Sequence, residues 1–113
     1  VPKTLESYIE DLPKDFKIVD LGCGDGRLLY ALVKKGLLKN AKEVVGIDLS
    51  EERIKRVRQI LPSVKGIVAD ACNAKELPDR YFDIVLCQQV IEHVPDDKAL
   101  LKEIRRLLNL DGG

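Results

Sequence analysis

The stretch Val19-Asp20-Leu21-Gly22-Cys23-Gly24-Asp25-Gly26-Arg27 has a glycine at every second position from residue 22 to residue 26. An apolar run at 17–21 leads into it, and leucines at helical spacing follow it. Because glycine has no Cβ atom, such a loop can turn tightly, approach a ligand closely and direct helix N-terminal N–H groups at an anion. The pattern predicts a strand–loop–helix unit with an anion site. For this motif alone, a glycine-rich turn without a ligand stays open as the alternative.

Outward from this loop, the chain alternates between strand and helix patterns. Apolar runs predict strands at 17–21, 43–48, 65–69 and 82–87. Helical spacing predicts helices at 4–12, 26–35, 51–61 and 97–108, with one further helical turn near 74–77. Thr4 and Ser50 are the expected N-caps, and Gly36 is placed to end the second helix. Strands that are apolar throughout indicate a parallel sheet covered on both faces, and right-handed crossovers make it a doubly wound, Rossmann-like α/β fold.

Polar residues follow the ends of the expected strands, where ligands of such sheets bind. They are Asp20, Asp48, Asp70 and Gln88. An acidic side chain at the position of Asp48 can accept hydrogen bonds from both hydroxyls of a ribose. Taken alone, a helix-capping or solvated aspartate would be the simpler interpretation. Its register with the glycine loop favours a nucleoside ligand.

Five segments in order resemble the successive motifs of class I S-adenosylmethionine-dependent methyltransferases. They are residues 20–26, 46–50, 70–71, 82–96 and 100–113. The resemblance spans nearly the whole chain. It implies the strand order 3-2-1-4, one S-adenosylmethionine-binding domain over residues 1–113, and transfer of a methyl group to an acceptor.

The resemblance assigns the glycine loop to the methionine end of S-adenosylmethionine. The loop glycines would hold that end of the cofactor: Gly22, Gly24 and Gly26. Asp20 would contribute to binding the ammonium group, and Gln88 would face the cofactor through its backbone.

The resemblance assigns the nucleoside end to the next two strand ends. Asp48 would bind the ribose, and Leu49 would pack on the adenine. The carboxylate of Asp70 would reach the adenine amino group, and the backbone N–H of Ala71 would reach a ring nitrogen.

Methyl transfer from a sulfonium requires positioning and exclusion of water, and it requires a general base only if the acceptor must lose a proton. His93, the single histidine, follows Glu92 just beyond the fourth expected strand and is the candidate base, with packing or loop capping as the alternative role. No metal site is expected. Gln89 stands where similar segments of small-RNA ribose methyltransferases carry a carboxylate ligand, and the chain offers no second histidine.

Two other functions stay open. A nicotinamide-dependent oxidoreductase also joins a glycine loop to an acidic residue, but its GxGxxG pattern needs glycine where Arg27 stands. A non-catalytic module that binds S-adenosylmethionine and is completed by another chain is the second alternative.

Composition restricts the class of partner. The 113 residues carry 19 basic and 19 acidic side chains, so the formal net charge of zero does not indicate nucleic-acid binding and favours a small-molecule acceptor. No apolar run is long enough to span a membrane. The three cysteines form no CxxC pair, which favours reduced thiols in a cytoplasmic protein.

The C-terminal segment 110–113 matches one that, in the resembling family, leads into a fifth strand and a final hairpin. We therefore expect the C-terminal strands to be missing and the acceptor site to be incomplete. The strand at 82–87 would then be an unprotected edge, which a second copy of the chain or another polypeptide would cover.

Overall fold

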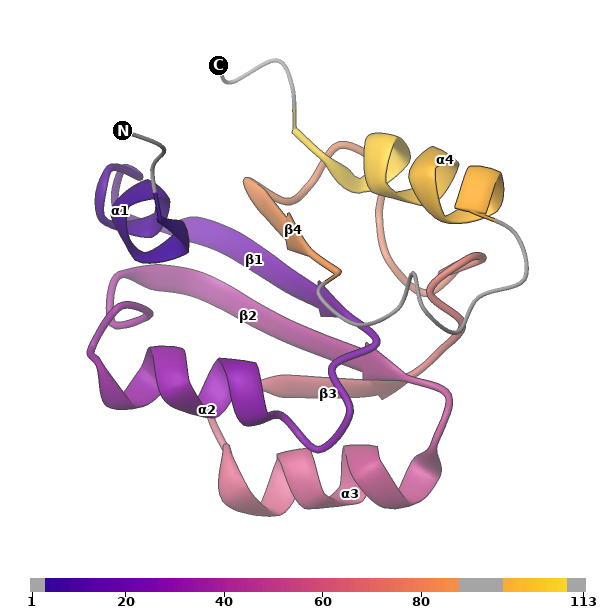
Figure 1. Ribbon diagram of the computed structural model, residues 1–113, viewed down its shortest axis with the longest axis horizontal. Coiled ribbons are helices and arrows are strands. Elements are labelled where there is room, and N and C mark those ends of the chain that lie inside the picture. Colours follow the sequence, from indigo (N-terminus) through magenta and orange to yellow (C-terminus); the bar gives the residue numbers. More distant parts are fainter. Residues whose placement is uncertain (1–3, 88–96, 110–113) are drawn as a thin grey trace.

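A parallel four-stranded sheet with the order β3-β2-β1-β4 forms the centre of the computed structural model, in which residues 4–87 and 97–109 are described (Figure 1). The strands are β1 (Phe16–Leu21), β2 (Ala41–Asp48), β3 (Lys65–Val68) and β4 (Ile84–Leu86). The helices are α1 (Leu5–Glu10), α2 (Arg27–Lys34), α3 (Glu51–Ile60) and α4 (Asp97–Leu107). The expected Rossmann-like architecture and its strand order 3-2-1-4 are confirmed.

Each face of the sheet has its own hydrophobic core. Ile18 and Val44 point to one face, where they pack with α1, α2 and α3, while Val19 and Val45 point to the other, where α4 and the chain after β3 cover them (Figure 1). All four side chains are buried because successive residues of a strand face opposite sides. This two-sided burial explains why the strands are continuously apolar in sequence.

Local capping chemistry sets the helix ends. The hydroxyl of Thr4 accepts a hydrogen bond from the N–H of Ser7 at 3.1 Å, and that of Ser50 accepts one from Arg53 at 3.3 Å. Gly36 follows the end of α2 in the left-handed conformation, with φ of 74°. All three sequence-based expectations about helix ends are confirmed.

The fourth strand differs from its expected extent, whereas the short segment before it agrees with the prediction. The fourth strand is limited to Ile84–Leu86, because the N–H of Phe82 donates to Leu107 at 2.9 Å and Phe82 forms a parallel bridge with Leu108. The outer edge at Phe82 is therefore covered by the chain that follows α4. The segment 74–77 forms the single turn that the sequence predicts, closed by the N–H of Leu77 and the carbonyl of Ala74 at 3.0 Å.

The carboxyl ends of the strands meet at one edge, since Asp20 is in register with Gly46 of β2 and with Leu86 of β4. Asp48 is in register with Val68, at the end of β3. The loops that leave these strands therefore share one rim of the sheet. Among the described residues, no helix is both long and apolar enough to cross a bilayer.

Candidate functional site

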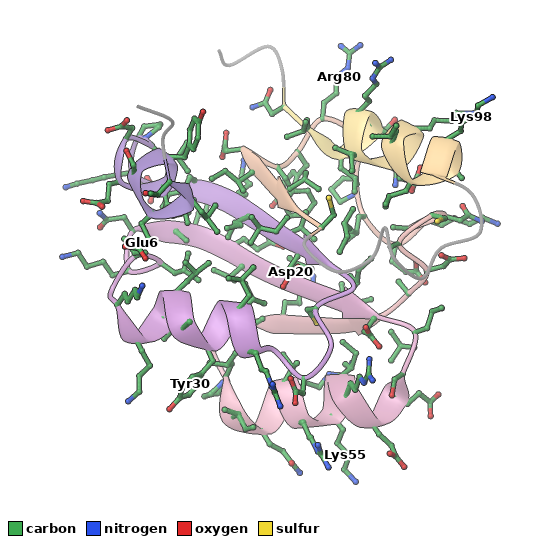
Figure 2. All side chains as sticks on the ribbon, viewed as in Figure 1. Glu6, Asp20, Tyr30, Lys55, Arg80 and Lys98 are labelled. Carbon is green, nitrogen blue, oxygen red and sulfur yellow. The ribbon has the colours of Figure 1, made fainter. Side chains whose placement is uncertain are left out.

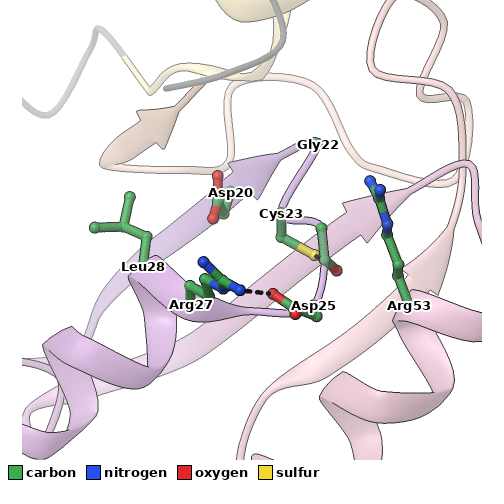
Figure 3. Close-up of a pocket in the computed structure, with 8 residues that line it drawn as sticks. Asp20, Gly22, Cys23, Asp25, Arg27, Leu28 and Arg53 are labelled. Carbon is green, nitrogen blue, oxygen red and sulfur yellow. Dashed lines mark hydrogen bonds and ion pairs between the residues drawn. The ribbon is translucent and has the colours of Figure 1, made fainter.

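A pocket of about 440 Å³ lies at the end of β1, between the glycine loop and the beginnings of α2 and α3 (Figure 3). Its lining residues are Asp20, Gly22, Cys23, Gly24, Asp25, Arg27, Leu28 and Arg53. The sequence-predicted residues Asp20, Gly22 and Gly24 therefore lie together around one cavity.

Three glycines give the loop its shape. Gly22, Gly24 and Gly26 have φ values of 74°, 61° and 87°, a backbone conformation that residues with a Cβ atom adopt only with strain. At Gly26 a Cβ atom would also lie 3.2 Å from the Val57 side chain and 3.3 Å from that of Leu61. Gly26 thus fixes the start of α2 against α3, while Gly22 and Gly24 let the backbone line the pocket.

Asp20 is a buried carboxylate that lines the pocket. It is 3% exposed, yet no described residue donates a hydrogen bond to its side chain. Burial, followed by the charge of Asp48, raises the pKa of Asp20 to about 7. Figure 2 shows Asp20 in the middle of the molecule, whereas the labelled Glu6, Tyr30 and Lys55 project from its periphery. A cation placed in the pocket would favour the charged form of Asp20 and so oppose the upward shift of its pKa.

Asp48, at the end of β2, is joined to the glycine loop. Its carboxylate accepts hydrogen bonds from the N–H of Gly24 at 3.2 Å and from the N–H of Ser50 at 2.9 Å. A carboxylate has about four acceptor positions, so two remain for a ligand. Asp48 does not itself line the cavity, but it holds one of the residues that do.

Cys23 anchors the loop. Its N–H donates to the carbonyl of Ile47 at 2.8 Å, and its side chain occupies the space beside Gly46, where a Cβ atom would lie 3.0 Å from the sulfur. Burial, with the nearby carboxylates, raises the pKa of Cys23 to about 12. Burial and Asp20 also raise the pKa of Cys87, at the end of β4. Both thiols are therefore protonated at neutral pH and are poor nucleophiles.

Two arginines at the pocket were not among the residues singled out from the sequence as ligands. Arg27 is the first residue of α2, with a side chain that is 93% exposed and 3.8 Å from the carboxylate of Asp25. Arg53 reaches toward the loop from the first turn of α3 (Figure 3). Their positions in the first turns of helices that begin at the sheet rim were the available signal.

The residues predicted to bind adenine lie on the same rim, beyond the pocket lining. Leu49 is 71% exposed, which leaves its side chain available for stacking. The carboxylate of Asp70 accepts from the N–H of Cys72 at 2.9 Å. Ala71 is 7% exposed, and its N–H has no acceptor among the described residues.

Two predicted site residues, Gln88 and His93, lie outside the described residues, so their expected roles stay predictions. The same holds for the expectation about a metal, since Gln89 and Glu92 lie in that segment too.

The sequence matches the methyltransferase domain family over residues 19–113. A ubiquinone biosynthesis O-methyltransferase of Idiomarina loihiensis is 35% identical over 100 residues, which are 85% of this chain and 39% of that protein. Its counterpart from Neisseria meningitidis is 31% identical, over 85% of this chain and 41% of its own length. The chain thus spans about two fifths of the length of these curated relatives.

Solved structures show the same relationship. A TehB-like SAM-dependent methyltransferase from Corynebacterium glutamicum superposes with a TM-score of 0.73 and 29% identity, over 94% of this chain and 57% of that one. An S-adenosylmethionine-dependent methyltransferase from Mesorhizobium loti gives 0.70 and 28%, over 89% and 46%. With the glycine loop, the strand order and the family match in agreement, the chain belongs to the methyltransferase domain family.

Proposed function

We propose that the chain binds S-adenosylmethionine at the pocket beside β1 and forms the cofactor-binding part of a methyltransferase. The observation that carries the proposal is the carboxylate of Asp20, which is buried, lines the pocket and has no donor among the described residues. A buried charge without a partner lowers the stability of the folded chain unless a group of opposite charge pairs with it. The ammonium group of S-adenosylmethionine is a partner of the right charge, and the glycine loop gives its methionine end room to approach.

The other end of the cofactor fits the groups that follow β2 and β3. Asp48 has acceptor capacity left for ribose hydroxyls after its bonds to Gly24 and Ser50. The exposed side chain of Leu49 offers an apolar surface for the adenine ring, and the N–H of Ala71 offers a donor to a ring nitrogen. These roles depend on groups that the ligand-free chain leaves available.

When bound, S-adenosylmethionine supplies the methyl group as an electrophilic sulfonium. The contribution of this chain is to bind and orient the two ends of the cofactor and to keep water from the reacting centre. His93 remains the proposed base for an acceptor that must lose a proton, and Gln88 remains a proposed backbone contact.

We infer a small molecule with a reactive hydroxyl as the acceptor, because the curated relatives are named O-methyltransferases of ubiquinone biosynthesis. A cytoplasmic location stays a prediction, supported by three cysteines that form no disulfide. A second copy or a partner chain beside β4 likewise stays a proposal.

Titration calorimetry tests cofactor binding with S-adenosylmethionine, S-adenosylhomocysteine and NAD as ligands. The two sulfur ligands are expected to bind and NAD to bind more weakly. Asp20→Asn and Asp48→Ala should each lower the affinity for S-adenosylmethionine by about tenfold or more, since each removes a bond to a charged acceptor. Glu10→Gln, an exposed change on α1, is the matched control and should leave the affinity unchanged. Tighter binding of NAD, or no heat with either sulfur ligand, would disprove the proposal.

A transfer assay separates an enzyme from a binding module. Methyl-labelled S-adenosylmethionine is incubated with hydroxyl-bearing quinone precursors, and labelled product is measured. Binding without transfer by the full-length protein would favour the non-catalytic alternative.

A further inference from the structure

The connection between β3 and β4, residues 69–83, carries two of the proposed adenine contacts, Asp70 and Ala71, but contains no helix and no strand of the sheet. Buried backbone groups need hydrogen-bond partners, and an irregular segment has no ladder to supply them. Ala74, in the middle of the connection, is fully buried. Inside the connection the carbonyl of Ala74 accepts from the N–H of Leu77, but the N–H of Ala74 has no acceptor there, so partners from outside the connection are needed.

Two side chains of α4 supply those partners. The N–H of Ala74 donates to Glu103 at 2.7 Å, and the carbonyl of Ala74 accepts from Arg106 at 2.8 Å. Arg106 also donates to Glu103 at 2.9 and 3.0 Å, and to the carbonyl of Leu77 at 2.9 Å. A fifth bond joins Arg106 to the exposed carboxylate of Asp79. The guanidinium thus uses all its donors, in a planar geometry that an ammonium group cannot reproduce.

Glu103 and Arg106, which together we call the α4 clamp, hold Ala74 directly beside the proposed adenine contacts Asp70 and Ala71. The N–H of Asn73 donates to the carbonyl of Asp70 at 3.0 Å, and the N–H of Cys72 donates to the carboxylate of Asp70, so residues 70–73 form one tight turn. The turn is anchored at one end by β3 and at the other by Ala74. The direction of the Ala71 N–H therefore depends on where Glu103 and Arg106 hold Ala74.

We propose that Glu103 and Arg106 are positioning residues for adenine recognition, which hold Ala74 so that Ala71 and Asp70 face the base. This inference rests on the proposed function, because it takes S-adenosylmethionine as the ligand. It adds that the choice of base depends on a helix that follows β4 in the chain and contributes no direct contact to the adenine.

The test compares S-adenosylhomocysteine with S-inosylhomocysteine by titration calorimetry. In the second ligand a carbonyl replaces the adenine amino group, so the carboxylate of Asp70 would face an acceptor. The unaltered protein should prefer the adenine ligand by about tenfold or more, as expected where a buried polar group loses its partner. Arg106→Lys and Glu103→Gln should each reduce this preference at least threefold.

The ratio of the two affinities separates positioning from stability. Partial unfolding lowers both affinities by the same factor and leaves their ratio unchanged. The ratio therefore measures base preference even in a destabilised variant. Arg105→Lys, an exposed change at the neighbouring position of α4, is the control and should keep the preference of the unaltered protein.

Each outcome has a defined meaning. An adenine preference that persists in both variants overturns the positioning role and leaves the proposed function standing. Equal binding of the two ligands by the unaltered protein overturns adenine recognition by Asp70 and Ala71, and the inference with it. Failure of the unaltered protein to bind S-adenosylhomocysteine overturns the proposed function itself.

Discussion

The glycine loop and the β3–β4 connection each lie beside one buried carboxylate, and the two carboxylates differ in whether the described residues donate hydrogen bonds to them. Asp20, at the loop, is 3% exposed and receives no hydrogen bond from a described residue, and its pKa is raised to about 7 by burial and Asp48. Glu103, beneath the connection, is 9% exposed and accepts from Arg106 and Ala74. The hydrogen bond from Arg106 is the largest cause of the lowered pKa of Glu103.

The difference separates a group kept for a ligand from a group used to build the fold. A buried carboxylate with three donors stabilises the segment around it, because its charge is compensated inside the protein. A buried carboxylate without donors lowers stability unless a ligand compensates it. The contrast yields variants whose effects on stability should have opposite signs.

The largest expected effect is that of Asp20→Asn on the free energy of unfolding of the ligand-free chain at high pH. The folded pKa of Asp20 lies near 7 and its ordinary value is 3.8, so folding favours the protonated form. The stability that the native chain has below pH 4 is therefore lost as the pH rises toward 7. At about 1.4 kcal/mol per pKa unit, Asp20→Asn should be more stable than the native chain by up to about 4 kcal/mol at pH 8.

Urea unfolding of both proteins at several pH values measures this difference. The advantage of Asp20→Asn should grow between pH 4 and pH 8 and vanish at the acidic end. A difference that does not change with pH would contradict the raised pKa of Asp20, and with it the contrast between the two carboxylates.

A somewhat smaller effect of opposite sign is expected for Glu103→Gln. Removing the charge of Glu103 should cost about 2 kcal/mol, the scale of hydrogen bonds to a charged group, because Arg106 then keeps only the exposed carboxylate of Asp79 as its ion-pair partner. Since the pKa of Glu103 is lowered from 4.5, its contribution is present at neutral pH and is lost as the pH falls below that value. Urea unfolding of both proteins at pH 7 and at pH 2 measures the difference in stability where the contribution is present and where it is lost. Unchanged stability at pH 7 would show that the α4 clamp does not hold the connection.

The smallest effect compares two glycines with similar backbone angles. Gly26 and Gly36 have φ of 87° and 74°, so alanine is strained at both positions. Only at Gly26 would the new Cβ atom meet other side chains, those of Val57 and Leu61, whereas nothing lies within 4 Å at Gly36. Gly26→Ala should therefore cost about 1 kcal/mol more than Gly36→Ala, through overpacking between α2 and α3. Equal losses in urea unfolding would mean that α3 moves aside without cost.

Local sequence rules predicted the elements that depend on local interactions. Thr4 and Ser50 cap helices as expected, because a cap needs only a side-chain oxygen within three residues of the N–H it accepts from. The start of the fourth strand at Phe82 was wrong, since the backbone of Phe82 pairs with Leu107 and Leu108, at the far end of α4. No pattern near Phe82 carries that information.

In the candidate site too, the sequence predicts which residues take part but not their long-range contacts. The glycine spacing and the resemblance indicate Asp20 and Asp48, but they do not show that Asp48 accepts a hydrogen bond from Gly24 or that no described residue donates one to Asp20. Arg106 had no visible role in the sequence, where it is one of several basic residues on an amphipathic helix. Its bonds to Ala74 join residues that are 32 positions apart in the chain.

The alternation of strands and helices, the helix caps and the left-handed glycine loop could all be predicted from the sequence. They follow from hydrophobic period, side-chain oxygens and missing Cβ atoms, which act over a few residues. Which of the two buried carboxylates has its charge compensated could not be predicted in this way. Compensation of a buried charge depends on donors from distant segments, and folding alone brings Arg106 and Ala74 to Glu103 while leaving Asp20 facing an open pocket.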